Sequence, residues 1–132
     1  MIIWITSYPK SGNTWVRSLL STYLYTQDGI FNFNLLKNIL KFTSKKHLEF
    51  FTKDFSDIKK ISEYWIAAQN RINLYNENES ILLKTHSALC TLENNSFTNK
   101  KNTQAIIYIV RDPRNVITSI SNHYSLNIKE SY

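Results

Sequence analysis

The first 25 residues constrain the fold most, because an apolar run, a short polar loop and a helical pattern follow one another directly. Residues 2–6 (IIWIT) are continuous, β-branched and aromatic, which is typical of a buried strand. After the loop SYPKSGNTW, apolar side chains recur at helical spacing and predict a helix over about 13–25. The loop holds one of the two glycines and one of the two prolines of the chain. This order of strand, loop and helix favours a ligand held at the helix N-terminus.

Two further strand-type runs follow, SILLKTH at 80–86 and AIIYIV at 105–110. The second leads into RDPRNVITSISNHY, in which Pro113 suits the first turn of a helix. Strands that alternate with helices predict an α/β fold, here a P-loop-like three-layer α/β/α arrangement around a central parallel sheet. In such sheets ligands bind at the carboxyl ends of the strands, and the polar motifs of this chain all fall there.

The stretch between the first two strands predicts two helices. Residues 33–51 carry leucine and isoleucine at positions that suit a surface helix. Residues 56–78 keep an apolar spacing of three or four throughout, with Ser56 as a suitable N-cap. We expect the aromatic side chains of this second helix to belong to the core.

Composition limits the classes of partner. The net charge of +6 suits a polyanionic ligand, but the lysines are spread over 37–60 and 100–101 without a dense run, which argues against nucleic acid. Cys90 is the only cysteine, and the three histidines lie far apart, so we expect neither a disulfide nor a metal site. Neither a leader nor an apolar run near the ~18 residues of a membrane span is evident, so we expect a cytoplasmic location and no membrane span.

The first loop has the residue types of an anion-binding site. Lys10 supplies a positive charge, and Gly12 permits close approach of the backbone. Ser11 and Thr14 add hydroxyl donors. A Walker A loop requires G-x-x-x-x-G-K-[ST], whereas Lys10 precedes Gly12. That order disfavours a Mg²⁺-dependent P-loop kinase, and Asp112 after the last strand can simply cap the next helix.

Three segments resemble motifs of the sulfotransferases that use 3′-phosphoadenosine 5′-phosphosulfate (PAPS). SYPKSGNTW resembles that family's 5′-phosphosulfate-binding loop, which reads close to TYPKSGTTW. IIYIVRDPRNVITSISNHY resembles its 3′-phosphate-binding segment, in which an arginine closes a strand and a serine follows eight residues later, here Arg111 and Ser119. LLKTH resembles the stretch that carries the catalytic histidine, and it lies between the other two motifs as in the family.

The resemblance implies a binding site for PAPS as co-substrate. Lys10 would contact the 5′-phosphosulfate and its bridging oxygen, and Trp15 would lie against the adenine. Arg111 and Ser119 would hold the 3′-phosphate, which distinguishes PAPS from other nucleotides. The residues that would cradle the 5′ end follow Lys10 directly: Ser11, Gly12, Asn13 and Thr14.

The resemblance also implies a mechanism without a metal. His86 would be the general base that takes the proton of a hydroxyl or amine on a small-molecule or glycan acceptor. An imidazole with a pKa of about 6.5 accepts a proton at neutral pH. Lys10 and Lys84 would stabilise charge on the sulfuryl group during in-line transfer. The helices expected over 33–51 and 56–78 would frame the acceptor pocket.

Simpler interpretations exist for single residues. His86 can be a structural histidine with a hydrogen bond. Arg111 can pair with Asp112 or Asp57, and Ser119 can bond a backbone carbonyl of its own helix. The order and spacing of all three motifs together favour the functional interpretation.

Family domains are considerably longer, so the resemblance implies that residues 1–132 are the N-terminal portion of a sulfotransferase domain, with its C-terminal half absent. The fold is therefore expected to be truncated. Two alternatives to an active enzyme stay open, namely a non-catalytic PAPS- or nucleotide-binding remnant and a P-loop kinase relative. The sequence leaves the identity of the acceptor and the oligomeric state undecided.

Overall fold

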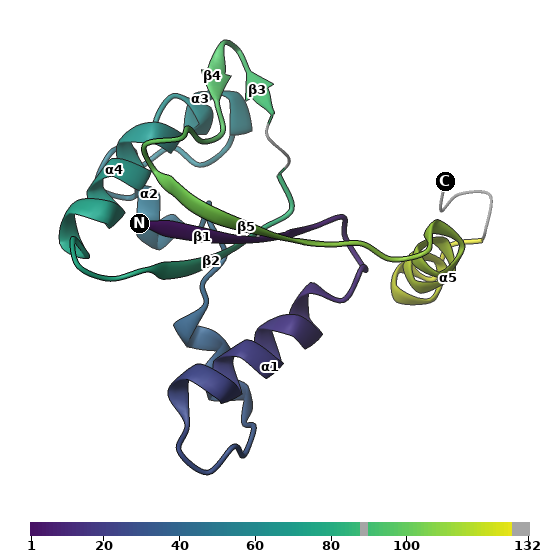
Figure 1. The fold of residues 1–132 in the computed structure, drawn as a ribbon. Coiled ribbons are helices and arrows are strands. Elements are labelled where there is room, and N and C mark those ends of the chain that lie inside the picture. Colours follow the sequence, from purple (N-terminus) through teal and green to yellow (C-terminus); the bar gives the residue numbers. More distant parts are fainter. Residues whose placement is uncertain (88–89, 128–132) are drawn as a thin grey trace.

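Three parallel strands form the centre of the molecule, and the computed structural model describes residues 1–87 and 90–127 (Figure 1). They are β1 (Ile2–Ser7), β2 (Ile81–Thr85) and β5 (Thr103–Ile109). Their order in the sheet is β2-β1-β5, and both pairs are parallel. The predicted parallel α/β sheet is confirmed, and the first strand of the sequence lies in its middle.

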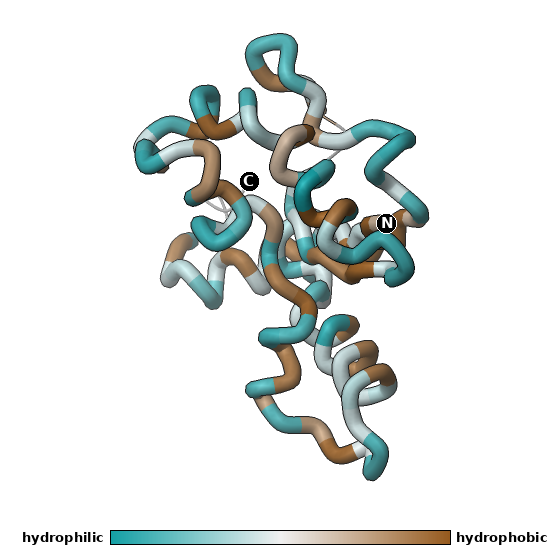
Figure 2. The backbone as a smooth tube through the Cα atoms, turned by 90° about the vertical axis from the view of Figure 1, so that its left-hand side faces the viewer, coloured by the Kyte–Doolittle hydropathy of each residue, from teal (hydrophilic) through white to brown (hydrophobic). Residues whose placement is uncertain are grey.

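Side chains of β1 alternate between the two faces of the sheet, and each face has its own core. Trp4 belongs to the larger cluster, in which its ring centroid lies 5.5 Å from that of Phe42 and 5.2 Å from that of Phe97. Ile5 belongs to the smaller cluster, together with Ile39 and neighbouring aliphatic side chains. Figure 2 shows that apolar stretches run through the centre of the molecule, whereas the connecting loops are mainly hydrophilic.

Helices lie on both faces of the sheet, so the predicted three-layer arrangement is confirmed (Figure 1). One face carries α1 (Asn13–Tyr25) and the 3₁₀ helix η1 (Phe33–Asn38). The opposite face carries the three remaining helices of the central region, which are α2 (Lys45–Leu48), α3 (Ile58–Ser62) and α4 (Trp65–Tyr75). Trp65 packs edge-on against Phe97 at 5.2 Å, so this part of the aromatic stripe lies in the core as expected, whereas Tyr75 at the end of α4 is 71% exposed.

The predicted helix over 33–51 is wrong. The stretch contains η1, an extended piece around Lys41 and the short α2. Tertiary pairing overrides the local helical pattern here, because the backbone N–H of Phe42 donates to the Lys84 carbonyl oxygen at 2.9 Å. This piece covers the outer edge of β2, which would otherwise expose its backbone groups.

The predicted helix over 56–78 is interrupted, since α3 ends at Ser62 and α4 begins at Trp65. Ser56 is also not the N-cap. Asp57 caps α3 by accepting a hydrogen bond from the Lys59 backbone N–H at 2.8 Å. The hydroxyl of Ser56 instead donates to Asp54.

A two-stranded hairpin, β3 (Thr91–Leu92) and β4 (Asn95–Ser96), was not predicted because each strand has only two residues. Glu93 and Asn94 form its turn with positive φ angles. The chain after this hairpin is anchored to α4 by Gln69, whose side chain is fully buried and donates to the Phe97 carbonyl oxygen at 2.6 Å.

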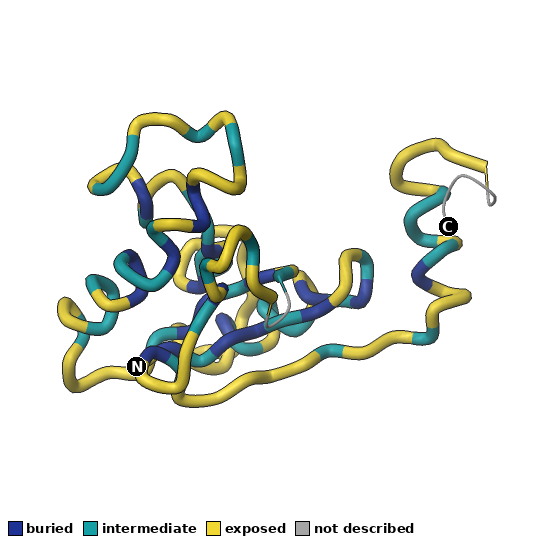
Figure 3. Tube along the Cα trace, turned by 90° about the horizontal axis from the view of Figure 1, so that it is seen from above, coloured by how far each residue is buried: buried dark blue, intermediate teal, exposed yellow. Residues whose placement is uncertain are grey.

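The last helix, α5 (Pro113–Tyr124), follows β5 and projects away from the sheet (Figures 1 and 3). Figure 3 shows β5 and the approach to α5 as mostly exposed. Within the described residues, β5 pairs with β1 alone, so its other edge carries unpaired backbone groups. No helix in residues 1–87 or 90–127 has the length and apolar character needed to cross a bilayer.

Candidate active site

The loop between β1 and α1 presents free backbone N–H groups at the carboxyl end of the central strand. Gly12 is the N-cap of α1 with a φ of 101°, a conformation that glycine adopts without strain. In the described part of the chain α1 has no side-chain cap, and its first turn holds no acidic residue. The first N–H groups of the helix and its positive dipole end therefore remain available to an anion.

His86 is joined to this loop by a bond that selects its tautomer. Its Nδ1 lies 2.8 Å from the carbonyl oxygen of Ser7, and a carbonyl can only accept, so Nδ1 carries the proton. The neutral ring then has Nε2 as its basic atom. The Asn13 amide lies behind this contact, since its Nδ2 donates to the Ser7 hydroxyl at 3.2 Å and to the Ile5 carbonyl at 3.3 Å.

Two lysine charges act on the histidine. Burial lowers the pKa of His86, the Ser7 carbonyl raises it, and the nearby charges of Lys84 and Lys41 lower it again. Burial also lowers the pKa of Lys84, as do the charges of Arg17 and Lys41. The electrostatics favour a neutral imidazole, which is the form that accepts a proton.

On the opposite side of the loop, Arg111 donates from Nη1 to the Lys10 carbonyl oxygen at 2.9 Å. The ion pairs considered for Arg111 are not formed. Asp112 pairs with Arg114 at 2.6 Å and caps α5, which confirms the capping role considered for it, and Asp57 caps α3. The charge of Arg111 is thus not neutralised by Asp112 or Asp57.

A cavity of about 350 Å³ lies between the loop and α5. Ser11 and Arg111 line it on one side, and Val116 and Ile120 line it on the other. It combines a cation with apolar walls, which suits a ligand with a charged group and a flat apolar part.

Two predicted site residues stay apart from this cluster. Trp15 is 69% exposed and lies on the outer side of α1 beside Leu19 and Tyr23. Ser119 is half-buried in α5. Among the described residues, its hydroxyl forms no hydrogen bond with the β1–α1 loop. The side chain of Asn13 is only 4% exposed and turned inward, where its Nδ2 donates to the Ser7 hydroxyl. Its backbone N–H remains the group that can face a ligand.

Comparison with protein families identifies the fold's relatives. The family model described as the sulfotransferase domain matches residues 2–131. The chain belongs to the sulfotransferase domain family. No curated protein and no solved structure matched the chain.

In this sulfotransferase domain, three segments far apart in the sequence meet at one end of the sheet. Ser7 links the first loop to His86, and Lys10 links it to Arg111. The sequence predicted this meeting from the rule that parallel strands end at the same edge. It did not predict Ser7, Arg17 and Lys41 as neighbours of the site, and of these only Ser7 had a signal, as the last residue of the first strand.

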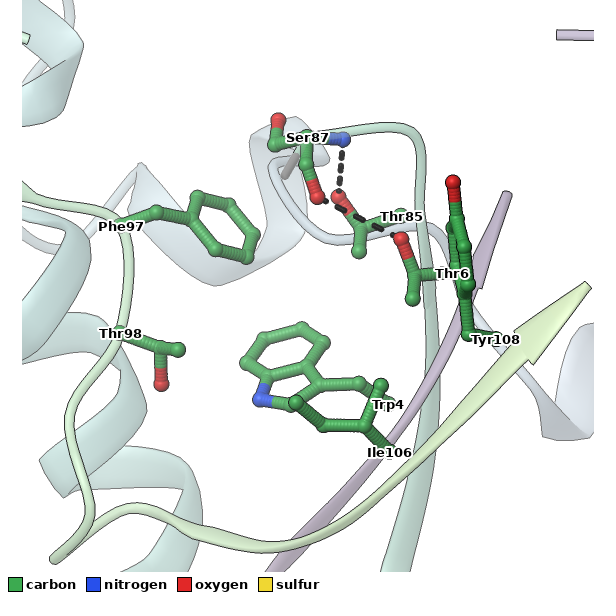
Figure 4. Close-up of a pocket in the computed structure, with 8 residues that line it drawn as sticks. All are labelled: Trp4, Thr6, Thr85, Ser87, Phe97, Thr98, Ile106 and Tyr108. Carbon is green, nitrogen blue, oxygen red and sulfur yellow. Dashed lines mark hydrogen bonds between the residues drawn. The ribbon is translucent and has the colours of Figure 1, made fainter. Parts of the chain in front are cut away.

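A second cavity of about 250 Å³ lies on the other face of the sheet, where the hydroxyls of Thr6 and Thr85 lie near the rings of Trp4 and Tyr108 (Figure 4). Thr6 donates to the Ser87 carbonyl oxygen at 3.4 Å. Because Thr85 and His86 are consecutive in the extended chain, their side chains face opposite sides, and this cavity is separated from His86 by the sheet. Among the described residues, no three His, Cys, Asp or Glu side chains gather so as to hold a metal ion.

Proposed function

We propose that this sulfotransferase domain binds PAPS at the β1–α1 loop and transfers its sulfuryl group to a hydroxyl or amine. One observation carries the proposal. The loop contacts the histidine of the second motif through Ser7 and the arginine of the third through Lys10. The histidine motif and the arginine motif are both far from the loop in the sequence, yet each contacts it, one on either side.

The residues around the loop fit the charges of the donor. The uncapped N-terminus of α1 and the ammonium of Lys10 would receive the 5′-phosphosulfate, with the loop from Ser11 to Thr14 as cradle. Arg111 would receive the 3′-phosphate. The roles of Ser119 on the 3′-phosphate and of the exposed Trp15 ring on the adenine require that the nucleotide extend to these two side chains, which lie apart from the loop contacts.

The chemistry assigned to His86 is proton removal. Its Nε2 would take the proton of the acceptor hydroxyl or amine as the new bond to sulfur forms and the bond from sulfur to the phosphate oxygen breaks. The products are the sulfated acceptor, 3′-phosphoadenosine 5′-phosphate and a protonated His86. Lys10 would stabilise the negative charge that develops on the leaving oxygen, and Lys84 would help to stabilise charge on the transferred sulfuryl group.

The first test is calorimetric titration of the purified chain with 3′-phosphoadenosine 5′-phosphate, AMP and ATP–Mg²⁺. We expect the bisphosphate to bind at least about tenfold more tightly than AMP, because Arg111 pairs with the additional phosphate. Arg111→Ala is expected to abolish that preference, and Lys10→Ala to weaken binding of all three nucleotides.

His86→Ala separates catalysis from binding. We expect it to bind the bisphosphate as the parent chain does and to lose transfer from PAPS by about 10²–10⁴-fold. Equal affinities for the bisphosphate and AMP would refute the donor assignment. Intact transfer in His86→Ala would refute the base assignment while leaving the donor site standing.

A further inference from the structure

Lys41 and Lys84 lie side by side although 42 positions separate them in the sequence. The extended piece around Lys41 forms a parallel bridge with β2, in which the Lys84 backbone N–H donates to the Leu40 carbonyl oxygen at 2.8 Å. Residues paired in this way direct their side chains to the same face of the sheet. Lys84 also pairs in register with Ile5, whose side chain belongs to the core under α1, so both lysines lie on the α1 face.

Arg17 brings a third positive charge to this face from α1. Its Nη2 donates to the carbonyl oxygens of Leu36 and Ile39 at 2.9 and 2.6 Å, which holds the chain that leads into Lys41. The lowered pKa of Lys84 reports the same proximity, since burial and the charges of Arg17 and Lys41 all act on it.

Among the described residues, no carboxylate forms an ion pair with this group, which consists of the lysine pair (Lys41 and Lys84) and Arg17. In residues 1–87 and 90–127, the ion pairs are Lys59–Glu93, Lys60–Asp54 and Arg114–Asp112. None of them includes a member of the group. Positive side chains held close together by the backbone repel one another, and a bound anion would offset this repulsion.

The lysine pair lies on the side of the site away from the donor contacts. Arg111 meets the loop from the β5 side of the sheet, whereas Lys84 lies on β2 and Lys41 lies beyond it. His86 follows Lys84 by two residues, and both Lys84 and Lys41 affect its pKa. An acceptor whose hydroxyl reached Nε2 of His86 from the β2 side would therefore pass over the lysine pair.

We propose that the lysine pair binds a carboxylate or sulfate group carried by the acceptor, so that this domain selects anionic acceptors such as acidic sugars. Lys41 is exposed and Lys84 is half-buried, and an ammonium group donates charge-assisted hydrogen bonds to a carboxylate or sulfate oxygen. Arg17 adds positive potential and positions the segment before Lys41. This inference rests on the proposed function in that it places an acceptor beside His86.

The test compares three p-nitrophenyl sugars, the β-glucuronide, the β-glucoside 6-sulfate and the neutral β-glucoside, which differ only at the sugar C6 position. Binding is measured by calorimetry, with and without saturating 3′-phosphoadenosine 5′-phosphate. We expect each anionic sugar to bind about tenfold more tightly than the glucoside at low salt, with the preference reduced at high salt. Lys41→Gln should bring the ratio close to one. Lys101→Gln removes the same charge from an exposed turn and should leave the ratio unchanged.

Equal binding of the three sugars, binding of none, or a preference that survives in Lys41→Gln would each overturn the proposal. A preference lost equally in Lys101→Gln would also overturn it, because net charge alone would then explain the effect. The titration with 3′-phosphoadenosine 5′-phosphate tests the donor site separately. If the donor site fails, the sugar titrations without nucleotide still measure binding at the lysine pair.

Discussion

At the scale of single residues, one backbone contact decides what His86 can do. The Ser7 carbonyl occupies Nδ1, so the imidazole presents Nε2 to the surroundings in its neutral form. Ser7 is itself held by Asn13, whose buried Oδ1 has no hydrogen-bond partner among the described residues. The residues that orient the proposed base are therefore the strand end and the first residue of α1, not the residues beside it in sequence.

Replacement of Lys84 tests the electrostatics around His86. We expect Lys84→Met to raise the pKa of His86, because a cation that destabilises the imidazolium is removed while the Ser7 bond remains. Titration of the His86 ring signals by NMR would measure this, and the acid limb of the pH profile for sulfuryl transfer should move to higher pH. Lys101→Met is the matched control and should leave the titration of His86 unchanged. An unaltered or lower pKa in Lys84→Met would contradict the geometry.

At the scale of elements, polar side chains hold together pieces that are too short to be stable alone. α4 is linked to the chain after β4 by Gln69, which donates to the Phe97 carbonyl and accepts from the Thr98 hydroxyl at 2.6 Å in both cases. That link carries Phe97 into the core against Trp4 and Trp65. A hairpin of two-residue strands gains its fixed position from these contacts.

Gln69→Leu is expected to destabilise the fold by about 1–3 kcal/mol, because the Phe97 carbonyl and the Thr98 hydroxyl both lose a buried partner. Urea unfolding followed by tryptophan fluorescence would measure the change. Leu74→Gln, on the exposed side of the same helix, is the control and should change stability by less than about 0.5 kcal/mol. A Gln69→Leu variant as stable as its parent would show that the link is dispensable.

At the scale of the whole molecule, the positive charge is distributed unevenly. Cations gather at the carboxyl end of the sheet, and one of the three ion pairs of the described residues, Arg114–Asp112 at the start of α5, lies there as well. β5 adds little to the core, and α5 projects beyond it (Figure 3). The stability of the molecule thus depends on the two clusters that flank β1 and β2, and the proposed site lies at a rim with a surplus of positive charge.

The histidines predict how stability responds to pH. Burial lowers the pKa of both His47 and His86, and neighbouring lysines act in the same direction. Below the unfolded value of about 6.5 the unfolded chain binds more protons than the folded one, so the free energy of unfolding decreases as the pH falls. We expect lower stability at pH 5.5 than at pH 7.5 in urea unfolding. His47→Gln should reduce the difference, and a chain more stable at pH 5.5 would contradict the partial desolvation of these rings.

The sequence by itself determined the α/β class, the three strands of the sheet, α1 and the beginning of α5. These elements follow from local signals, because a strand-type apolar run, a helical spacing or the proline at Pro113 each involves only a few neighbouring residues. It also determined that the three motifs meet, because parallel strands share an edge. The family match agrees with that interpretation.

Only the tertiary structure decided what lies between the first two strands and what surrounds His86. The segment around Lys41 pairs with β2 because that edge needs backbone partners, which outweighs a modest helical preference. The same pairing places Lys41 beside Lys84, and the approach of Ser7 selects the tautomer of His86. Contacts of this kind join residues tens of positions apart, so no local pattern in one sequence encodes them.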